Sequence, residues 1–294
     1  MKTQSKTWGM AEGGLLCFAL MVVGMLLQLS VGPVHWDAFR WPVNGLALLV
    51  LLTVLLSAYG LRRRIPFFRW MATLKAGIPA LLTCAMITTL MGVTRQVPSG
   101  HVPTEPIGIT SMLSFWPFVL AYTWLMLLVG MVCLTRMVHP SWRNIPFLLH
   151  HLGIFIALIA GTLGNADMQR LVMSVQEGKT EWRAVDAKHR VHELPVAIEL
   201  HDFSIKGTEE RPVYVSDVTA YTKSGIVKRD TILVNKPMSI RGWEVYQRSY
   251  EDGRGMVGDI SVLELVRDPW LPYVYVGIFM MLGGAVCMFV KRKE

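Results

Sequence analysis

Two adjacent histidines, His150 and His151, lie near the start of an apolar run of membrane-spanning length that covers residues 146 to 164. An ionisable ring inside hydrocarbon is costly, and such rings usually face a partner group, a proton path or a cofactor. A neutral imidazole is also a common metal ligand through one of its ring nitrogens. This pair is therefore the strongest indication of chemistry in the sequence.

Helical geometry separates the two side chains by about 100° around the axis. His150 shares its face with small residues, namely Gly153, Ala157, Ala160, Gly161 and Gly164, whereas His151 shares its face with the bulkier Ile154, Phe155 and Leu158. Small residues mark helix contacts in membranes, so geometry alone favours His150 as the residue that faces another helix. Three alternatives stay open: His151 is a ligand, His150 is a ligand, or both only hydrogen-bond to neighbouring helices.

The composition places the helix that carries these histidines in a membrane. The chain has 52% hydrophobic and 17% charged residues, with a mean hydropathy of +0.41. Six runs are long enough to span a bilayer: 13–31, 43–60, 77–93, 114–135, 146–164 and 270–290. The first run is long, lacks a small-x-small cleavage site and is followed at once by another span, so we do not expect a cleaved signal peptide.

The basic residues predict the orientation. Outside residues 165–269 there are 14 Lys and Arg, and all but Arg40 and Arg95 lie at the same set of span ends. The positive-inside rule therefore puts both termini and the loops 61–76 and 136–145 in the cytoplasm, with residues 165–269 on the other side of the membrane. The histidine pair then lies within about two helical turns of the cytoplasmic end.

Charge and cysteine usage exclude two classes of function. Residues 165–269 hold 15 Lys and Arg against 17 Asp and Glu, so the net charge of +8 comes from the membrane part and does not imply a nucleic-acid partner. The four cysteines all lie in predicted spans and none belongs to a C-x-x-C pair, which argues against thiol exchange by this chain: Cys17, Cys84, Cys133 and Cys287.

The stretch before the last span is rich in strand patterns. From residue 191 onward, alternating segments are separated by turn signals such as Ser224-Gly225 and Arg241-Gly242. We expect residues 165–190 to be helical or irregular, and the rest to form a small antiparallel sandwich or barrel-like domain. The predicted fold class is a mixed membrane protein, with about six transmembrane helices and an extracytoplasmic β-rich domain inserted before the last helix.

The sequence resembles the ResB family, also called CcsB, of the system II pathway of cytochrome c biogenesis. The resemblance is carried by ELPVAIELHDFSI (193–205), YVSDVTAY (214–221) and above all NKP…G-x-x-x-YQ (235–247), together with the spans SFWPFVLAYTWLMLLVGMVCL (114–134) and HHLGIFIALIAGTLG (150–164). It covers roughly residues 77–294. The predicted parts are 1–76, two additional spans; 77–164, ResB-like spans; 165–269, the β-rich domain; and 270–294, the final span and cytoplasmic tail.

The resemblance implies a function in haem delivery. ResB-like proteins work with a second membrane protein of the CcsA or ResC type, whose tryptophan-rich WWD segment and external histidines hold haem. Together they move haem b outward, keep it reduced, and attach it to apocytochrome c. This chain has no WWD-like segment. It therefore looks like the non-catalytic half of a haem-attaching synthetase of the bacterial inner (plasma) membrane, with lipid, haem and apocytochrome c as its other partners.

The resemblance also favours one histidine of the pair. In ResB-like sequences a span histidine followed by an apolar residue and Gly ligates haem from the cytoplasmic side, and His151-Leu152-Gly153 fits that position. His151 is thus the predicted axial ligand of the haem iron, with His150 as the other candidate. The run Arg62 to Arg64 is a candidate contact for haem propionates, although the positive-inside rule already accounts for it.

The remaining histidines are weaker candidates. His35 and His101 lie in loops predicted to be external, and His139 lies in a loop predicted to be cytoplasmic. The simplest interpretation of all three is that they are polar loop residues. A metal site at His189 and His192 lacks an identified third ligand. Outside the haem pathway two alternatives compete: a b-type cytochrome subunit of a respiratory enzyme, and a haem-free scaffold that binds apocytochrome c.

Overall fold

The structure is a computed structural model that describes residues 8–97, 105, 107–138, 141–142, 144–208, 211–251 and 259–291. The chain divides into two compact units. The helical unit comprises residues 1–167 and 270–294, and the β unit comprises residues 168–269. Each unit has its own core, built from its own residues.

Six helices in the described ranges are long and apolar enough to cross a membrane. They are α1 (Met10–Val31), α2 (Val43–Leu61), α4 (Leu74–Val93), α5 (Trp116–Met137), α6 (Ile145–Gly164) and α7 (Leu271–Lys291). The prediction of a multi-pass membrane protein with about six spans is confirmed. The side of the membrane on which each helix end lies stays a prediction.

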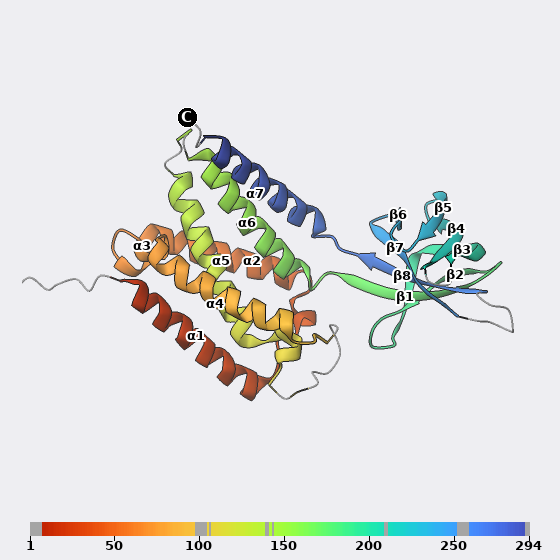
Figure 1. Cartoon of the computed structure of the whole chain (residues 1–294), viewed down its shortest axis with the longest axis horizontal. Helices are drawn as coiled ribbons and strands as arrows, with labels where there is room; N and C mark the ends of the chain where they lie inside the picture. Colours follow the sequence, from red (N-terminus) through yellow and green to blue (C-terminus); the bar gives the residue numbers. More distant parts are fainter. Residues whose placement is uncertain are drawn as a thin grey trace, which may run out of the picture. The chain divides into compact units, whose positions relative to one another are not determined.

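The N-terminal helices belong to the core of the helical unit (Figure 1). A short helix, α3 (Pro66–Met71), lies between α2 and α4, and its Trp70 is only 4% exposed. The Trp70 indole Nε1 donates to the carbonyl of Gly9 at 3.2 Å, and its ring stacks on Trp124 of α5 with centroids 6.4 Å apart. Two short 3-10 helices, η1 (Trp36–Phe39) and η2 (Ile109–Ser114), precede α2 and α5.

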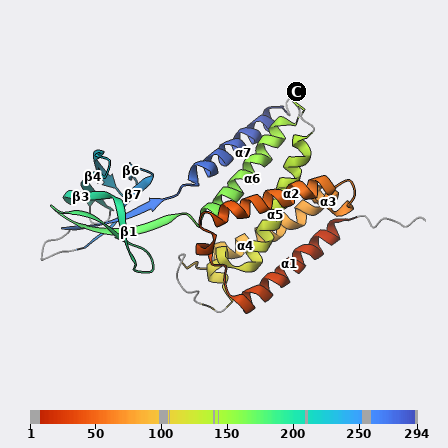
Figure 2. The ribbon, with the colours of Figure 1, turned by 180° about the vertical axis from the view of Figure 1, so that it is seen from behind.

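Helices α6 and α7 lie side by side in both ribbon views (Figure 2). Their backbones approach so closely that side chains do not fit at three glycines: Gly153, Gly277 and Gly284. A Cβ on Gly277 would lie 2.6 Å from the backbone nitrogen of Ala157. This is the small-residue packing that brings membrane helices together. Gly161 does not take part, because a Cβ there meets nothing within 4 Å.

The β unit is one eight-stranded sheet with the strand order β5-β4-β3-β2-β1-β8-β7-β6. Its strands are β1 (Gln169–Gln176), β2 (Thr180–Val185), β3 (Val191–Thr208), β4 (Arg211–Thr222), β5 (Val227–Leu233), β6 (Met238–Ile240), β7 (Trp243–Glu251) and β8 (Ile260–Arg267). Each strand pair is antiparallel. The predicted fold class is thus confirmed in its helices and in the β-rich domain between α6 and α7.

The expectation that residues 165–190 are helical or irregular is wrong. Residues 169–176 form β1, which pairs with β8, and 180–185 form β2. Leu171, Met173 and Val175 are buried and alternate with the more exposed Arg170, Val172, Ser174 and Gln176, so they form one face of a strand. Pairing with β8, which is distant in the sequence, stabilises this strand, whose outward face is mostly polar.

The ResB-like motif at 235–247 covers the turn after β5, the short strand β6 and the first residues of β7. Residues 234–237 turn between β5 and β6, where Leu233 and Lys236 exchange two backbone hydrogen bonds of 3.1 Å. Trp243 is 3% exposed and belongs to the core. Gln247 is also buried, and its Oε1 accepts hydrogen bonds from Ser216 at 2.6 Å and from Ser261 at 3.2 Å. A buried polar network therefore joins β4, β7 and β8.

Candidate functional site

Helix α6 positions both histidines near its N-terminal end. The helix starts at Ile145 with Pro146 in its first turn, a position where proline loses no intrahelical hydrogen bond. At about 1.5 Å per residue, His150 and His151 lie roughly 8–9 Å along the helix from its start. Both side chains are half-buried.

His150 faces α7, as the ridge of small residues predicts. Its Nδ1 lies 2.9 Å from the carbonyl oxygen of Met281, across the helix pair. A Cβ on Gly284 would lie 2.8 Å from the Cα of His150, so the two backbones are in contact at this level. His150 is therefore part of the contact between α6 and α7.

His151 lies on a different face of α6. Its Nδ1 lies 2.9 Å from the carbonyl oxygen of Phe147, one turn earlier in the same helix. The imidazole also stacks on the Phe147 ring, with centroids 3.9 Å apart and an interplanar angle of 26°. The guanidinium carbon of Arg136, in the last turn of α5, lies 5.1 Å from the Phe147 ring centroid.

The hydrogen bonds define the tautomer of each ring. A carbonyl oxygen only accepts, so Nδ1 carries the proton in both His150 and His151. In the neutral ring Nε2 then carries the lone pair, which is the form that ligates iron. A histidine held by a carbonyl through its other ring nitrogen is the usual arrangement of a metal ligand. The donor chemistry at both positions therefore fits a haem iron.

The two histidines cannot serve as the two axial ligands of one haem. Their ring centroids are 5.3 Å apart and the rings are nearly perpendicular, at 76°. Axial ligands approach the iron from opposite sides, whereas adjacent residues of one helix leave the same short stretch of backbone. If this chain held a haem, one ring of the pair could reach its iron, and any second axial ligand would have to come from elsewhere.

Among the residues that the structure describes, the other histidines form no comparable site. His192 Nε2 lies 3.0 Å from Asp186 and His201 Nε2 lies 2.7 Å from the Thr219 hydroxyl. Hydrogen bonds from His192, and then from Arg190, hold the pKa of Asp186 well below its usual range. His101 and His139 lie outside the described residues. Within the described ranges no three His, Cys, Asp or Glu side chains are grouped to hold a metal ion.

A polar cluster that the sequence did not reveal surrounds Asp167. Its carboxylate accepts hydrogen bonds from the Trp41 backbone at 2.8 Å, from Asn44 at 2.7 Å and from the Trp270 indole at 2.7 Å. Asn44 is fully buried at the start of α2 and also donates to the carbonyl of Leu163 at 3.2 Å. The cluster joins α2 to the adjoining ends of α6 and α7. A lone Asn in an otherwise apolar run was the signal in the sequence.

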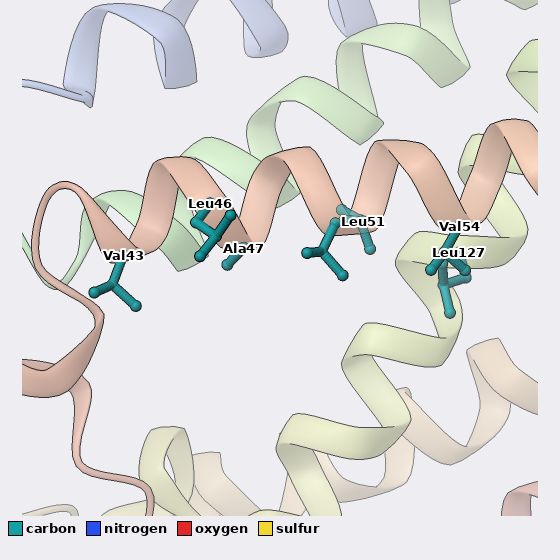
Figure 3. Close-up of a pocket in the computed structure, with 7 residues that line it drawn as sticks. Val43, Leu46, Ala47, Leu51, Val54 and Leu127 are labelled. Carbon is teal, nitrogen blue, oxygen red and sulfur yellow. The ribbon is translucent and has the colours of Figure 1, made fainter.

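An apolar groove lies along α2 (Figure 3). It has a volume of about 410 Å³ and is lined by Val43, Leu46, Ala47, Val50, Leu51 and Val54 of α2 with Leu127 of α5. Every lining side chain is aliphatic. The groove therefore offers contact for apolar groups and no group for chemistry.

Comparisons with known proteins point to one family over part of the chain. The model of the ResB-like family matches residues 140–258, a stretch that includes both candidate histidines and most of the β unit. None of the curated proteins matches the chain.

Among solved structures, the cytochrome c heme lyase CcmF is similar, with 11% identity and a TM-score of 0.37 over 94% of this chain and 45% of that chain. This chain thus spans less than half of that protein's length.

Proposed function

We propose that this chain is a haem-handling subunit of a cytochrome c assembly complex of the system II type. In this function it receives haem b at the cytoplasmic end of α6 and helps to present it, reduced, for attachment to apocytochrome c outside the membrane. The observation that carries the proposal is the geometry of His151. Its Nδ1 proton is held by the Phe147 carbonyl, and its ring lies off the α6–α7 contact, so Nε2 offers a lone pair to an iron.

The family comparison supports the same function. The ResB-like match covers residues 140–258 and therefore includes the helix that carries the proposed ligand. The chain's own part in this function is to bind and orient: α6 sets the direction of the imidazole, and Phe147 restricts its rotation by stacking. Attachment of haem to apocytochrome c is assigned to the partner, a WWD-bearing protein of the CcsA or ResC type.

A b-type cytochrome subunit of a respiratory enzyme is the second candidate. It would hold its haem within one chain, between histidines on two spans. In the sequence only the span at 146–164 has histidines within its hydrophobic run, so this chain supplies ligands from one helix. This favours a haem shared with a partner over a haem held by this chain alone. A haem-free scaffold for apocytochrome c is the third candidate.

The experiment compares the chain alone with the chain co-expressed with a WWD-bearing partner. We expect little haem in the isolated chain and a b-type absorption spectrum in the co-purified complex. A strong bis-histidine spectrum from the isolated monomer would favour the respiratory subunit. A complex in which only the partner's own histidines are needed for haem would favour the scaffold.

A further inference from the structure

Arg136 lies beside the ring pair that carries the proposed haem ligand. Its guanidinium carbon is 5.1 Å from the centroid of Phe147, and the same Phe147 ring stacks on His151. The Arg136 side chain is exposed. One aromatic ring thus bridges a cationic group at the end of α5 and the imidazole on α6.

The surrounding sequence supplies no carboxylate for this cation. From residue 106 to residue 166 there is no Asp or Glu, so α5, α6 and the loop between them carry no acidic side chain. A guanidinium presents parallel N–H donors that match a carboxylate or a phosphate in a two-point contact. The anion that completes this site has to come from outside these two helices.

We infer that Arg136 binds a propionate of the haem whose iron His151 ligates. The inference rests on the function proposed above. Haem carries an iron centre and two carboxylates on one edge, and this corner of the chain offers an imidazole lone pair and a guanidinium joined through a single ring. The haem then lies with its carboxylate edge toward the C-terminal end of α5, where Arg136 is in the last turn.

The run Arg62 to Arg64, which the sequence offered for the same purpose, has a different environment. The Arg62 guanidinium carbon lies 3.5 Å from the ring centroid of Tyr59 in its own helix, and its Nη1 donates to the Tyr59 carbonyl at 3.1 Å. No histidine ring is part of this contact. Arg62 is thus a matched control, because it is also a cation over an aromatic ring at a helix end but does not lie beside the proposed ligand.

The test is a four-way comparison of haem affinity in the co-purified complex of the full-length chain with its WWD-bearing partner, reconstituted in zwitterionic lipid. Wild type and Arg136→Ala are each titrated with haem and with haem dimethyl ester, in which both carboxylates are blocked. We expect Arg136→Ala to weaken haem binding about ten-fold, which corresponds to about 1.4 kcal/mol. The ester should weaken wild-type binding by a similar factor and leave Arg136→Ala unaffected.

Controls separate the inference from its alternatives. Arg62→Ala should prefer haem to the ester as strongly as wild type does, and Arg136→Lys should keep part of that preference. If Arg136→Ala still prefers haem to the ester as wild type does, Arg136 does not contact a propionate. If its effect appears only when anionic lipid is added, the residue binds lipid phosphate, and the inference is wrong while haem ligation by His151 stands. Failure of the wild type to bind haem at any concentration would overturn both proposals.

Discussion

The Nδ1 atom of His150 lies 2.9 Å from the carbonyl oxygen of Met281, so this histidine joins α6 to α7. The next residue, His151, has its hydrogen bond within its own helix. Two residues of the same type and adjacent in sequence thus have different structural partners, and replacing them should separate packing from ligation.

We expect His150→Ala to destabilise the α6–α7 pair. Hydrogen bonds between membrane helices contribute about 0.6 kcal/mol on average and up to about 1.7 kcal/mol, which sets the size of the loss. Thermal unfolding in detergent measures it. Thr89→Ala is the control, because the exposed Thr89 hydroxyl bonds the Ala85 carbonyl within its own helix, α4. Equal losses for both variants would mean that the Met281 contact adds nothing.

Adding one methyl group at the glycine contacts should separate α6 from α7. A Cβ on Gly153 would overlap the backbone of Met281 and Gly277, whereas one on Gly161 meets nothing within 4 Å. Gly153→Ala should therefore destabilise by about 1–3 kcal/mol, the usual cost of overpacking. Gly161→Ala should be neutral or slightly stabilising, because alanine favours a helix. Unfolding temperatures that fall equally would contradict the observed contact.

The Asp167 cluster should make stability depend on pH. Partial burial by itself raises the pKa of Asp167, but hydrogen bonds from Trp41, Asn44 and Trp270 outweigh it and hold this pKa below its ordinary value. The folded chain therefore binds this proton less readily than the unfolded chain. The stabilisation is complete above the unfolded pKa of about 3.9 and is lost as the pH falls through the folded-state value.

Replacing this carboxylate tests the argument directly. Asp167→Asn removes the charge, and we expect it to lower stability near neutral pH by about 1.5–3 kcal/mol, the range for hydrogen bonds to a charged group. The difference from wild type should shrink as the pH falls below about 4, where the carboxyl of the unfolded wild-type chain begins to take up its proton. The test is to measure the free energy of unfolding of wild type and Asp167→Asn at several pH values. A difference that stays constant with pH would show that charge plays no part.

The Gln247 network should hold β4, β7 and β8 together. Gln247→Ala leaves the buried Ser216 and Ser261 hydroxyls without their shared acceptor, at a cost of about 1–3 kcal/mol. We expect faster amide hydrogen exchange in these three strands of the full-length protein. Arg248→Ala, which changes an exposed neighbour, should leave exchange unchanged. Similar exchange in both variants would mean that the network does not stabilise the sheet.

The spans were predictable from the sequence because hydropathy over a helix length needs no tertiary information. The strand β1 was not, since its burial depends on pairing Met173 with Leu263, residues distant in the sequence. The candidate sites were predictable to the same extent, because contacts within one helix can be inferred from the sequence and contacts between helices cannot. Geometry along one helix predicted that His150 faces a neighbour, whereas the Asp167 cluster and the placement of Arg136 beside Phe147 depend on contacts between helices.

The most direct measurement of the central claim is the haem content of the two histidine variants in the co-purified complex. His151→Gly removes the proposed ligand and opens a cavity that imidazole fits, so we expect loss of haem and of holocytochrome c, with partial recovery when imidazole is added. His150→Gly should keep its haem at matched membrane protein levels, because it mainly loosens the α6–α7 contact. Rescue by imidazole in the His150 variant alone, or undiminished haem in both, would contradict His151 as the ligand.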